Sequence, residues 1–267
     1  IPEYMHSQLQ HIMSQQIIFF FFLIITDYPF HHWLCLFPIQ FHRVLLLQWL
    51  ISFRHFLINF TGIGNNHINL PFPQILIQQL DVTNEEAPAL LQQLIDSLGG
   101  MDLYFHSSGI GNQNPTLDVS IEMRTMQTNG DGFMRMVTAA FHYFKESKRK
   151  GHIAVISSIA GTRGLGIASA YSATKAFQNT YIQCLTQLAR MQHLPIRFTD
   201  IRPGFVRTAL LKAGNYPMQL TPEYTAKKIV KALKRGKRIA IIDWKYRLLV
   251  GFWRLIPRFI WERLPVK

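Results

Sequence analysis

The 267-residue chain has only two cysteines, Cys35 and Cys184. Small domains that depend on disulfides use many more, and two thiols make no metal-ligand cluster, so we expect neither a disulfide framework nor a metal site. The low cysteine content favours a reducing, cytoplasmic setting. With 48% hydrophobic residues, a chain of this length can bury a full core as one α/β domain.

Lysine is absent before Lys145, although the formal net charge is +13. Such a charge admits anionic partners: a nucleotide cofactor, nucleic acid or an anionic membrane surface. In "AKKIVKALKRGKR" the apolar Ile229, Val230 and Leu233 fall on one side at helical spacing. We therefore interpret these lysines as the solvent face of an ordinary amphipathic helix, and we expect no nucleic-acid partner.

Glycine is absent before Gly62, and residues 1–74 contain only four formally charged residues. The apolar runs "IIFFFFLII" and "RVLLLQWLISF" are shorter than the roughly 20 residues of a membrane-spanning helix. No basic stretch precedes the first run and no small-residue cleavage site follows it, which argues against a secretory signal. Two short or tilted membrane segments remain an alternative for this atypical N-terminal segment.

Residues 75–243 have an orderly pattern in which apolar runs of strand length alternate with helical stretches. This alternation is typical of βαβ units and a parallel sheet. Thr83 and Glu86 match a capping box at the start of one predicted helix, which a Gly-Gly pair ends. A longer helix is predicted over about residues 120–145. No linker or repeat interrupts the pattern, so we expect a single α/β domain.

Residues 244–267 form an amphipathic tail in which aromatic and basic side chains alternate. Pro257 divides the tail, which predicts two short helices. Such a segment can lie at a membrane surface, or it can fold back to close a pocket or a subunit contact. We adopt the second interpretation because an exposed apolar patch of this size is unusual, and we keep a peripheral membrane contact as the alternative.

Three side chains suggest proton-transfer chemistry. Tyr171 and Lys175 are four residues apart, so on a helix they share one face. A nearby ammonium favours the phenolate and lowers the pKa of a tyrosine, which makes the pair a usable general acid/base. Ser158 ends the strand "HIAVISS", from which it could donate a hydrogen bond to a substrate oxygen. An isolated Tyr-x-x-x-Lys would usually be a core tyrosine and a surface lysine.

The pattern is not isolated, because "LDVT", "TNGDG", "ISSIAG", "YSATK" and "RPGFVRT" occur in this order over about residues 75–245. This part of the chain resembles the short-chain dehydrogenase/reductase family. The resemblance implies a Rossmann-like, doubly wound parallel sheet and an NAD(P)-dependent oxidoreductase that acts on a carbonyl or secondary alcohol. It implies Ser158, Tyr171 and Lys175 as the catalytic set, with Asn129 completing a proton relay through water to the lysine.

The resemblance also implies how the cofactor, NADP or NAD, would be held. The cofactor-binding residues that it implies are Asp81, Val82, Gly109, Tyr171, Lys175, Pro203, Gly204, Val206 and Thr208. The choice between the two dinucleotides stays open because the second strand is not recognisable. The apolar stretch after Pro203 predicts a small-molecule substrate with apolar bulk. The family further implies a homodimer or tetramer in which helix 170–191 packs against its copy.

Two departures from the family pattern stand out. "HSSG" at residues 106–109 replaces the usual Asn-Asn-Ala-Gly, and we interpret His106 as a structural replacement. The glycine-rich phosphate loop is missing, since "TGIG" at residues 61–64 lies too close to Asp81 to serve as one. We hypothesise that residues 1–74 are a frameshifted, misread or decayed nucleotide-binding half. The alternative function is a catalytically impaired binding or scaffold protein with weak cofactor affinity.

Overall fold

The computed structural model describes residues 19–27, 31–39, 78–208, 210–211 and 216–266. Its strands form one sheet in the order β3-β1-β2-β4-β5-β6-β7. The strands are β1 (Phe19–Asp27), β2 (His31–Ile39), β3 (Gln79–Leu80), β4 (Leu103–His106), β5 (Gly151–Ile156), β6 (Ile196–Arg202) and β7 (Ile239–Ile241). The helices are α3 (Ala87–Ser97), α4 (Val119–Met126), η1 (Gln127–Gly132), α5 (Phe133–Ser147), η2 (Ile159–Thr162), η3 (Gly166–Ala168), α6 (Ser169–Met191), α7 (Pro222–Lys234), α8 (Trp244–Leu255) and α9 (Arg258–Trp261).

The sheet is parallel from β2 through β4, β5 and β6 to β7. β1 is the exception, because it pairs antiparallel with both β2 and β3. Only residues 28–30 separate β1 from β2, whereas a parallel connection needs a crossover of about a dozen residues or more. The expected α/β fold with a parallel sheet is confirmed, and the antiparallel β1 is a difference from it. The "TGIG" sequence at 61–64 lies outside the described residues.

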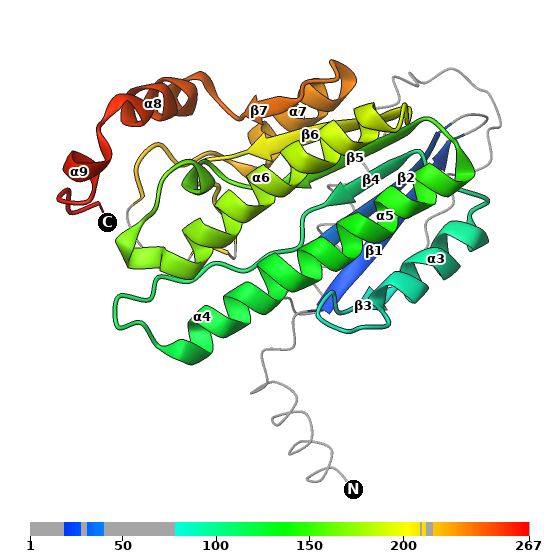
Figure 1. Cartoon of the computed structure of the whole chain (residues 1–267), viewed down its shortest axis with the longest axis horizontal. Helices are drawn as coiled ribbons and strands as arrows, with labels where there is room; N and C mark the ends of the chain where they lie inside the picture. Colours follow the sequence, from blue (N-terminus) through cyan, green and yellow to red (C-terminus); the bar gives the residue numbers. More distant parts are fainter. Residues whose placement is uncertain (1–18, 28–30, 40–77, 209, 212–215, 267) are drawn as a thin grey trace, which may run out of the picture.

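Helices cover both faces of the sheet (Figure 1). Helices α3, α5 and α6 share one hydrophobic core with Tyr104 and Ile153 of the strands. Helix α7 shares a second core with the neighbouring strand residues Phe105 and Ala154. Successive side chains of β4 and β5 thus enter opposite cores, as the two-residue period of a strand requires. This is the doubly wound arrangement that the sequence predicted.

Helix α3 begins later than the capping box predicted. Its first residue is Ala87, and Glu86 at the N-cap makes no capping hydrogen bond through its side chain. The Thr83 N–H and hydroxyl instead donate to Asp81 Oδ1, at 2.9 and 2.8 Å, and Glu86 N–H donates to Asn84 Oδ1 at 2.9 Å. The carboxylate and amide fold residues 81–86 into a turn, as such side chains commonly do. The predicted capping box was therefore wrong.

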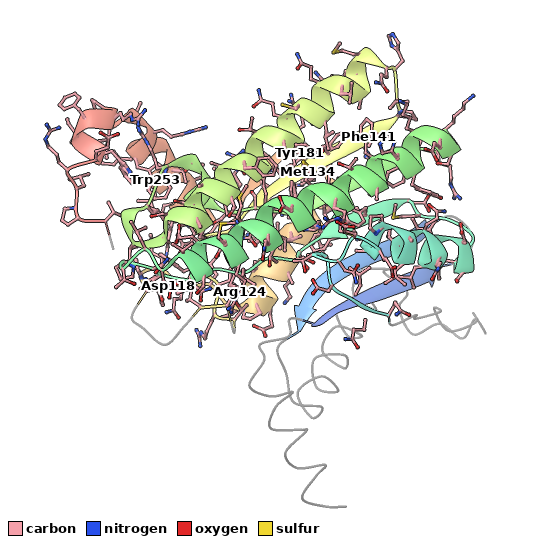
Figure 2. The ribbon with its side chains drawn as sticks, turned by 60° about the horizontal axis from the view of Figure 1, so that its bottom comes forward. Asp118, Arg124, Met134, Phe141, Tyr181 and Trp253 are labelled. Atoms are coloured by element: carbon pink, nitrogen blue, oxygen red, sulfur yellow. The ribbon has the colours of Figure 1, made fainter. Side chains whose placement is uncertain are left out.

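The long helix predicted over residues 120–145 is present as α4, η1 and α5 in direct succession. Asp118 caps its start by accepting a hydrogen bond of 2.8 Å from the Ser120 N–H (Figure 2). The middle segment η1 is a π-helix, which the apolar periodicity did not predict. Single π segments inside α-helices often occur at functional sites.

The tail forms two short helices, α8 and α9, on either side of Pro257, as predicted. They lie beyond one end of the sheet (Figure 1). Tyr246 of α8 is fully buried, and its hydroxyl accepts from the Phe205 N–H at 3.0 Å. The tail therefore folds back onto the chain after β6. No helix in the described part of the chain is both long and apolar enough to cross a membrane.

Two glycines give a paired test of this packing. A Cβ at Gly204 would overlap the ring of Tyr246, whereas a Cβ at Gly251 on α8 would meet no atom within 4 Å. We expect Gly204→Ala to lower the free energy of unfolding by about 1–3 kcal/mol. Gly251→Ala should raise it by about 0.5–1 kcal/mol, because alanine favours the helix. Urea denaturation of both variants measures the difference, and equal stabilities would contradict the close packing of α8.

Candidate active site

The carboxyl ends of β4 and β5 bring together residues that are far apart in sequence. Ser158 follows β5 at the N-cap of η2, and Gly109 follows β4. Tyr171 and Lys175 lie on the first turns of α6, and Asn129 lies in η1. Ligands of doubly wound sheets bind beyond these strand ends. The structure thus gathers Gly109 and the predicted catalytic set at one end of the sheet.

Lys175 is the most constrained of these residues. Its side chain is buried, and Nζ donates to the carbonyl oxygen of Ile156 at 3.1 Å and to Gln178 Oε1 at 3.0 Å. Burial lowers the pKa of Lys175 from 10.5 to about 8, and the negative charge of Asp200 opposes this shift. The group therefore remains mostly an ammonium at pH 7 but titrates close to it.

Tyr171 lies beside both Ser158 and Lys175. Burial raises the pKa of the Tyr171 phenol, and the hydrogen bond with the Ser158 hydroxyl acts in the opposite direction. The ring centroid is 5.8 Å from Lys175 Nζ. We expected the lysine to lower this pKa, but the ammonium is directed to Ile156 and Gln178 instead. Tyr171 is therefore a neutral phenol at physiological pH and can donate a proton.

Asn129 supports the site through the backbone of the loop after β4. Its Oδ1 accepts from the Ile110 N–H at 2.8 Å, and its Nδ2 donates to the Ile110 carbonyl at 2.7 Å. Gln178 Nε2 donates to the Asn129 carbonyl at 2.9 Å. A hydrogen-bonded path from Asn129 through Gln178 to Lys175 is thus built from protein groups. Sequence reasoning missed Gln178, although its position three residues after Lys175 puts both on one helix face.

The loop after β4 passes close to the catalytic side chains. A Cβ at Gly109 would lie 3.2 Å from Asn129 Oδ1 and 3.5 Å from Lys175 Nζ. A Cβ at Gly111 would lie 3.0 Å from the Tyr171 ring. The two glycines therefore leave room beside the tyrosine and the lysine that any larger residue would fill.

His106 occupies the core and not the site. Its Nδ1 lies 2.9 Å from the Tyr104 hydroxyl, and its ring packs edge-on against Phe133 with centroids 5.2 Å apart. Burial, aided by the positive charge of Lys175, lowers the pKa of His106 to about 3. The ring is therefore neutral at physiological pH. These contacts agree with our interpretation of His106 as a structural replacement.

The two residues predicted to border the adenine follow β3, near the edge of the sheet. Asp81 holds the turn before α3 with its carboxylate. Val82 is fully buried, and its carbonyl accepts from Arg135 at 3.1 Å. A Cβ at Gly132 would collide with Val82, so this strand end packs directly on η1. The end of β3 is thereby tied to the helix that carries Asn129.

The residues predicted to hold the nicotinamide end divide into two groups. The Pro203 carbonyl accepts from the Ile159 N–H at 3.1 Å, which places Pro203 next to Ser158. Gly204 instead packs under Tyr246 of α8. Val206 forms a bridge with Leu220, and Thr208 is exposed with its hydroxyl directed to the Val206 carbonyl. Of this group, these contacts place Pro203 beside Ser158 and the other three away from it.

A buried charged group behind the site was also missed from the sequence. Asp200 on β6 accepts hydrogen bonds from the Ser157 hydroxyl and from Arg202 Nε, the latter at 2.8 Å. All three side chains are buried. Asp200 therefore fixes the residue before Ser158 while its charge favours the ammonium of Lys175. Nothing in the sequence distinguishes this carboxylate from a surface one.

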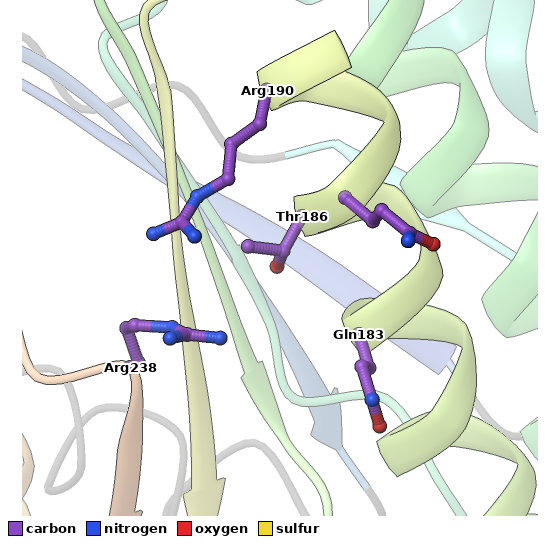
Figure 3. A pocket seen from close by; sticks show the side chains of 5 residues that line it. Gln183, Thr186, Arg190 and Arg238 are labelled. Atoms are coloured by element: carbon purple, nitrogen blue, oxygen red, sulfur yellow. The ribbon is translucent and has the colours of Figure 1, made fainter.

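A separate polar cavity of ≈ 200 Å³ lies along the later turns of α6, lined by Gln183, Thr186, Gln187, Arg190 and Arg238. Figure 3 shows Arg190 and Arg238 reaching into this space from α6 and from the start of the last strand. None of the predicted catalytic set contributes to its lining.

The described residues contain no group of three or more His, Cys, Asp or Glu that could hold a metal ion.

The doubly wound parallel sheet, with the Tyr-Lys pair on α6 and a serine after β5, places this protein in the Rossmann-like fold class. Residues 65–228 match the model of the short chain dehydrogenase family. The chain belongs to this family, whose members use NAD or NADP.

Two relatives illustrate the relationship. An uncharacterized oxidoreductase of Myxococcus xanthus (strain DK1622) is 30% identical over 69% of this chain and 74% of its own length. Dehydrogenase/reductase SDR family member 7B of Xenopus tropicalis is 28% identical over 70% of this chain and 65% of its own length. The structure of a short chain dehydrogenase from Burkholderia cenocepacia J2315 in complex with NADP is also similar. The aligned region spans 70% of this chain and 77% of that protein, with a TM-score of 0.60 and 19% sequence identity. This last likeness shows the fold.

The described residues fit the nicotinamide end of such a cofactor. Gly109 leaves open the space beside Asn129 and Lys175 that a Cβ would fill. Lys175 borders this space and Tyr171 borders the similar space at Gly111, each with a group that can bond a ribose hydroxyl. The pyrophosphate end cannot be matched in the same way, because the family's glycine-rich sequence is not in the chain.

The buried lysine makes stability depend on pH in a testable way. A lysine in the unfolded chain loses its proton near pH 10.5. Between about pH 8 and 10.5 the unfolded chain therefore keeps a proton that the folded protein has released. Stability should rise with pH over this window, by up to about 3 kcal/mol for a shift of this size. Lys175→Met should remove the rise. Urea denaturation of both proteins at several pH values measures it, and parallel profiles would show that Lys175 is not perturbed.

Proposed function

We propose that this protein transfers a hydride between the nicotinamide of NAD or NADP and a carbonyl or secondary alcohol. The observation that carries the proposal is the buried Tyr171 phenol beside Ser158, with the buried ammonium of Lys175 one helical turn away and 5.8 Å from the Tyr171 ring centroid. Such a set can bind one substrate oxygen from two hydroxyls and transfer a proton to it.

Each residue has a role that follows from its contacts. Ser158 donates a hydrogen bond to the substrate oxygen and orients the reacting carbon. Tyr171, a neutral phenol, gives its proton to that oxygen in the reduction and takes it back in the oxidation. The Lys175 ammonium stabilises the phenolate that the proton transfer leaves behind. When bound, the nicotinamide supplies or accepts the hydride.

The raised pKa of Tyr171 keeps the phenol protonated at neutral pH, which is the form that an acid catalyst of carbonyl reduction needs. In the chain after β6, Phe205 and Tyr216 lie with ring centroids 5.0 Å apart. These rings support a small-molecule substrate with apolar bulk.

Replacement of the phenol tests the proposal. Tyr171→Phe deletes one hydroxyl and should lower turnover at least about a hundredfold, the usual contribution of general acid/base catalysis. The matched control is Tyr181→Phe on the same helix, whose hydroxyl bonds Thr138 at 2.7 Å beside α5 (Figure 2) and should be dispensable for turnover. The absorbance of NADH and NADPH with apolar ketones gives the rates. Full activity of the Tyr171 variant would rule out the acid role.

A second candidate is a catalytically impaired scaffold of the same fold, which the missing glycine-rich motif favours. It predicts negligible affinity for both cofactors in spite of an intact Ser-Tyr-Lys set. Titration of the wild-type protein with NADH and with NADPH, followed by calorimetry, separates the two functions. Saturable binding supports the enzyme, and its absence with both cofactors supports the scaffold.

We also propose a homodimer or tetramer in which α6 packs against its copy. Leu188 and Met191 on α6 are apolar and exposed, and Met123 and Met126 are exposed on the adjacent α4. Static light scattering at micromolar concentration should give two or four times the mass of one chain. A single species with the mass of one chain would contradict the assembly.

A further inference from the structure

Helix α8 has two apolar faces, of which only one is used inside the protein. Its inner face carries Tyr246, Val250 and Trp253, which pack in one buried cluster. Trp253 Nε1 donates to the Thr162 hydroxyl at 3.0 Å, and Trp261 Nε1 of the tail donates to the Gly164 carbonyl at 2.8 Å. These contacts fix the orientation of the tail on the protein.

The outer face of α8 is a second apolar stripe that faces solvent. Trp244, Leu248, Phe252 and Leu255 have exposed fractions of 56%, 64%, 69% and 80%. They recur every three or four residues and therefore line one side of the helix, opposite the buried side chains. Phe259 of α9 is also apolar and exposed, with an exposed fraction of 62%. Exposed apolar patches of this kind usually mark an interaction surface.

The charges around this outer stripe identify the kind of partner. Residues 244–266 carry five cationic side chains and one acidic side chain, Glu262, which is bonded to Arg258 at 2.6 Å. At about 100° per residue, Arg247 and Arg254 flank one side of the stripe and Lys245 the other. An apolar centre with cationic edges is complementary to anionic lipid, whose acyl chains lie beneath negatively charged headgroups.

We propose that α8 and α9 bind in the plane of an anionic lipid bilayer through this outer stripe. A second copy of the chain is a poorer occupant, because the two cationic edges would repel each other. Spanning is excluded by length, since the 12 residues of α8 extend only about 18 Å against about 30 Å of hydrocarbon. The long aliphatic side chains at the centre of the stripe suit acyl chains and not nucleic-acid phosphates.

The contacts of the inner face fix the position of the outer stripe relative to the loops after Ser158 and Pro203. Trp253 and Tyr246 hold Thr162 and Phe205, which follow Ser158 and Pro203 closely in sequence. A bilayer bound to the outer stripe therefore lies near the loops that border the candidate active site. The surface proposal itself does not depend on the proposed hydride transfer.

Co-sedimentation of the full chain with vesicles tests the surface. Wild type should bind vesicles rich in phosphatidylserine, bind pure phosphatidylcholine vesicles weakly, and lose affinity as salt is raised. The variant Leu248→Ser/Phe252→Ser/Leu255→Ser should lose at least about tenfold in partitioning, because it removes three insertable side chains. Arg247→Gln/Arg254→Gln should weaken binding chiefly at low salt.

The matched control is Leu117→Ser/Met134→Ser/Ile239→Ser, which removes three exposed apolar side chains outside both α8 and the proposed dimer contact and should leave partitioning unchanged. All substituted side chains are exposed, and thermal melting checks that each variant folds. Equal partitioning of wild type and the α8 variant would overturn the proposal. So would light scattering that shows wild type joined through α8 into an oligomer that the α8 variant cannot form, because the stripe would then be covered by a second copy.

Discussion

One buried ammonium group holds the candidate active site together. Lys175 Nζ is bonded to the last residue of β5 and to Gln178, and Gln178 is bonded to Asn129 in η1. Asn129 in turn fixes Ile110 after β4 with two hydrogen bonds. A buried charge without such partners would cost several kcal/mol. The strand end, both helices and the loop must therefore be in place together, so the site is ordered when the core forms.

Much of the fold between residues 75 and 243 follows from patterns that short segments carry. Alternating strand-length and helix-length runs predicted the layered sheet, and Pro257 predicted the division of the tail into two helices. The details that depend on competition between local hydrogen bonds were not predictable in this way. Asp81 and Asn84 form a turn that delays α3, and the short connection at residues 28–30 makes β1 antiparallel. The first outcome depends on which partner a polar group finds in the folded chain, and the second on a pair of strands that the apolar runs did not reveal.

The candidate site shows the same division between residue type and environment. Ser158, Tyr171 and Lys175 could be selected from the sequence because their spacing and chemistry are distinctive. The raised pKa of Tyr171 could not be predicted, since it depends on how completely the fold buries the phenol. Gln178 and Asp200 were missed because amide and carboxylate side chains are common on helices and strands. Only their burial and their bonds to the catalytic region distinguish them.

The π-helical segment η1 also sets the angular phase between α4 and α5. A π turn accommodates one residue more than an α turn, and each residue of an α-helix advances the side chains by about 100°. Loss of one residue from 127–132 that restored a regular helix would turn α4 by about that angle relative to α5. Asn129 would then remain in the sequence but face away from Ile110 and Gln178. The number of residues in 127–132 is therefore as constrained as their identity. A single deletion there would turn Asn129 away from its partners, which no conservative substitution does.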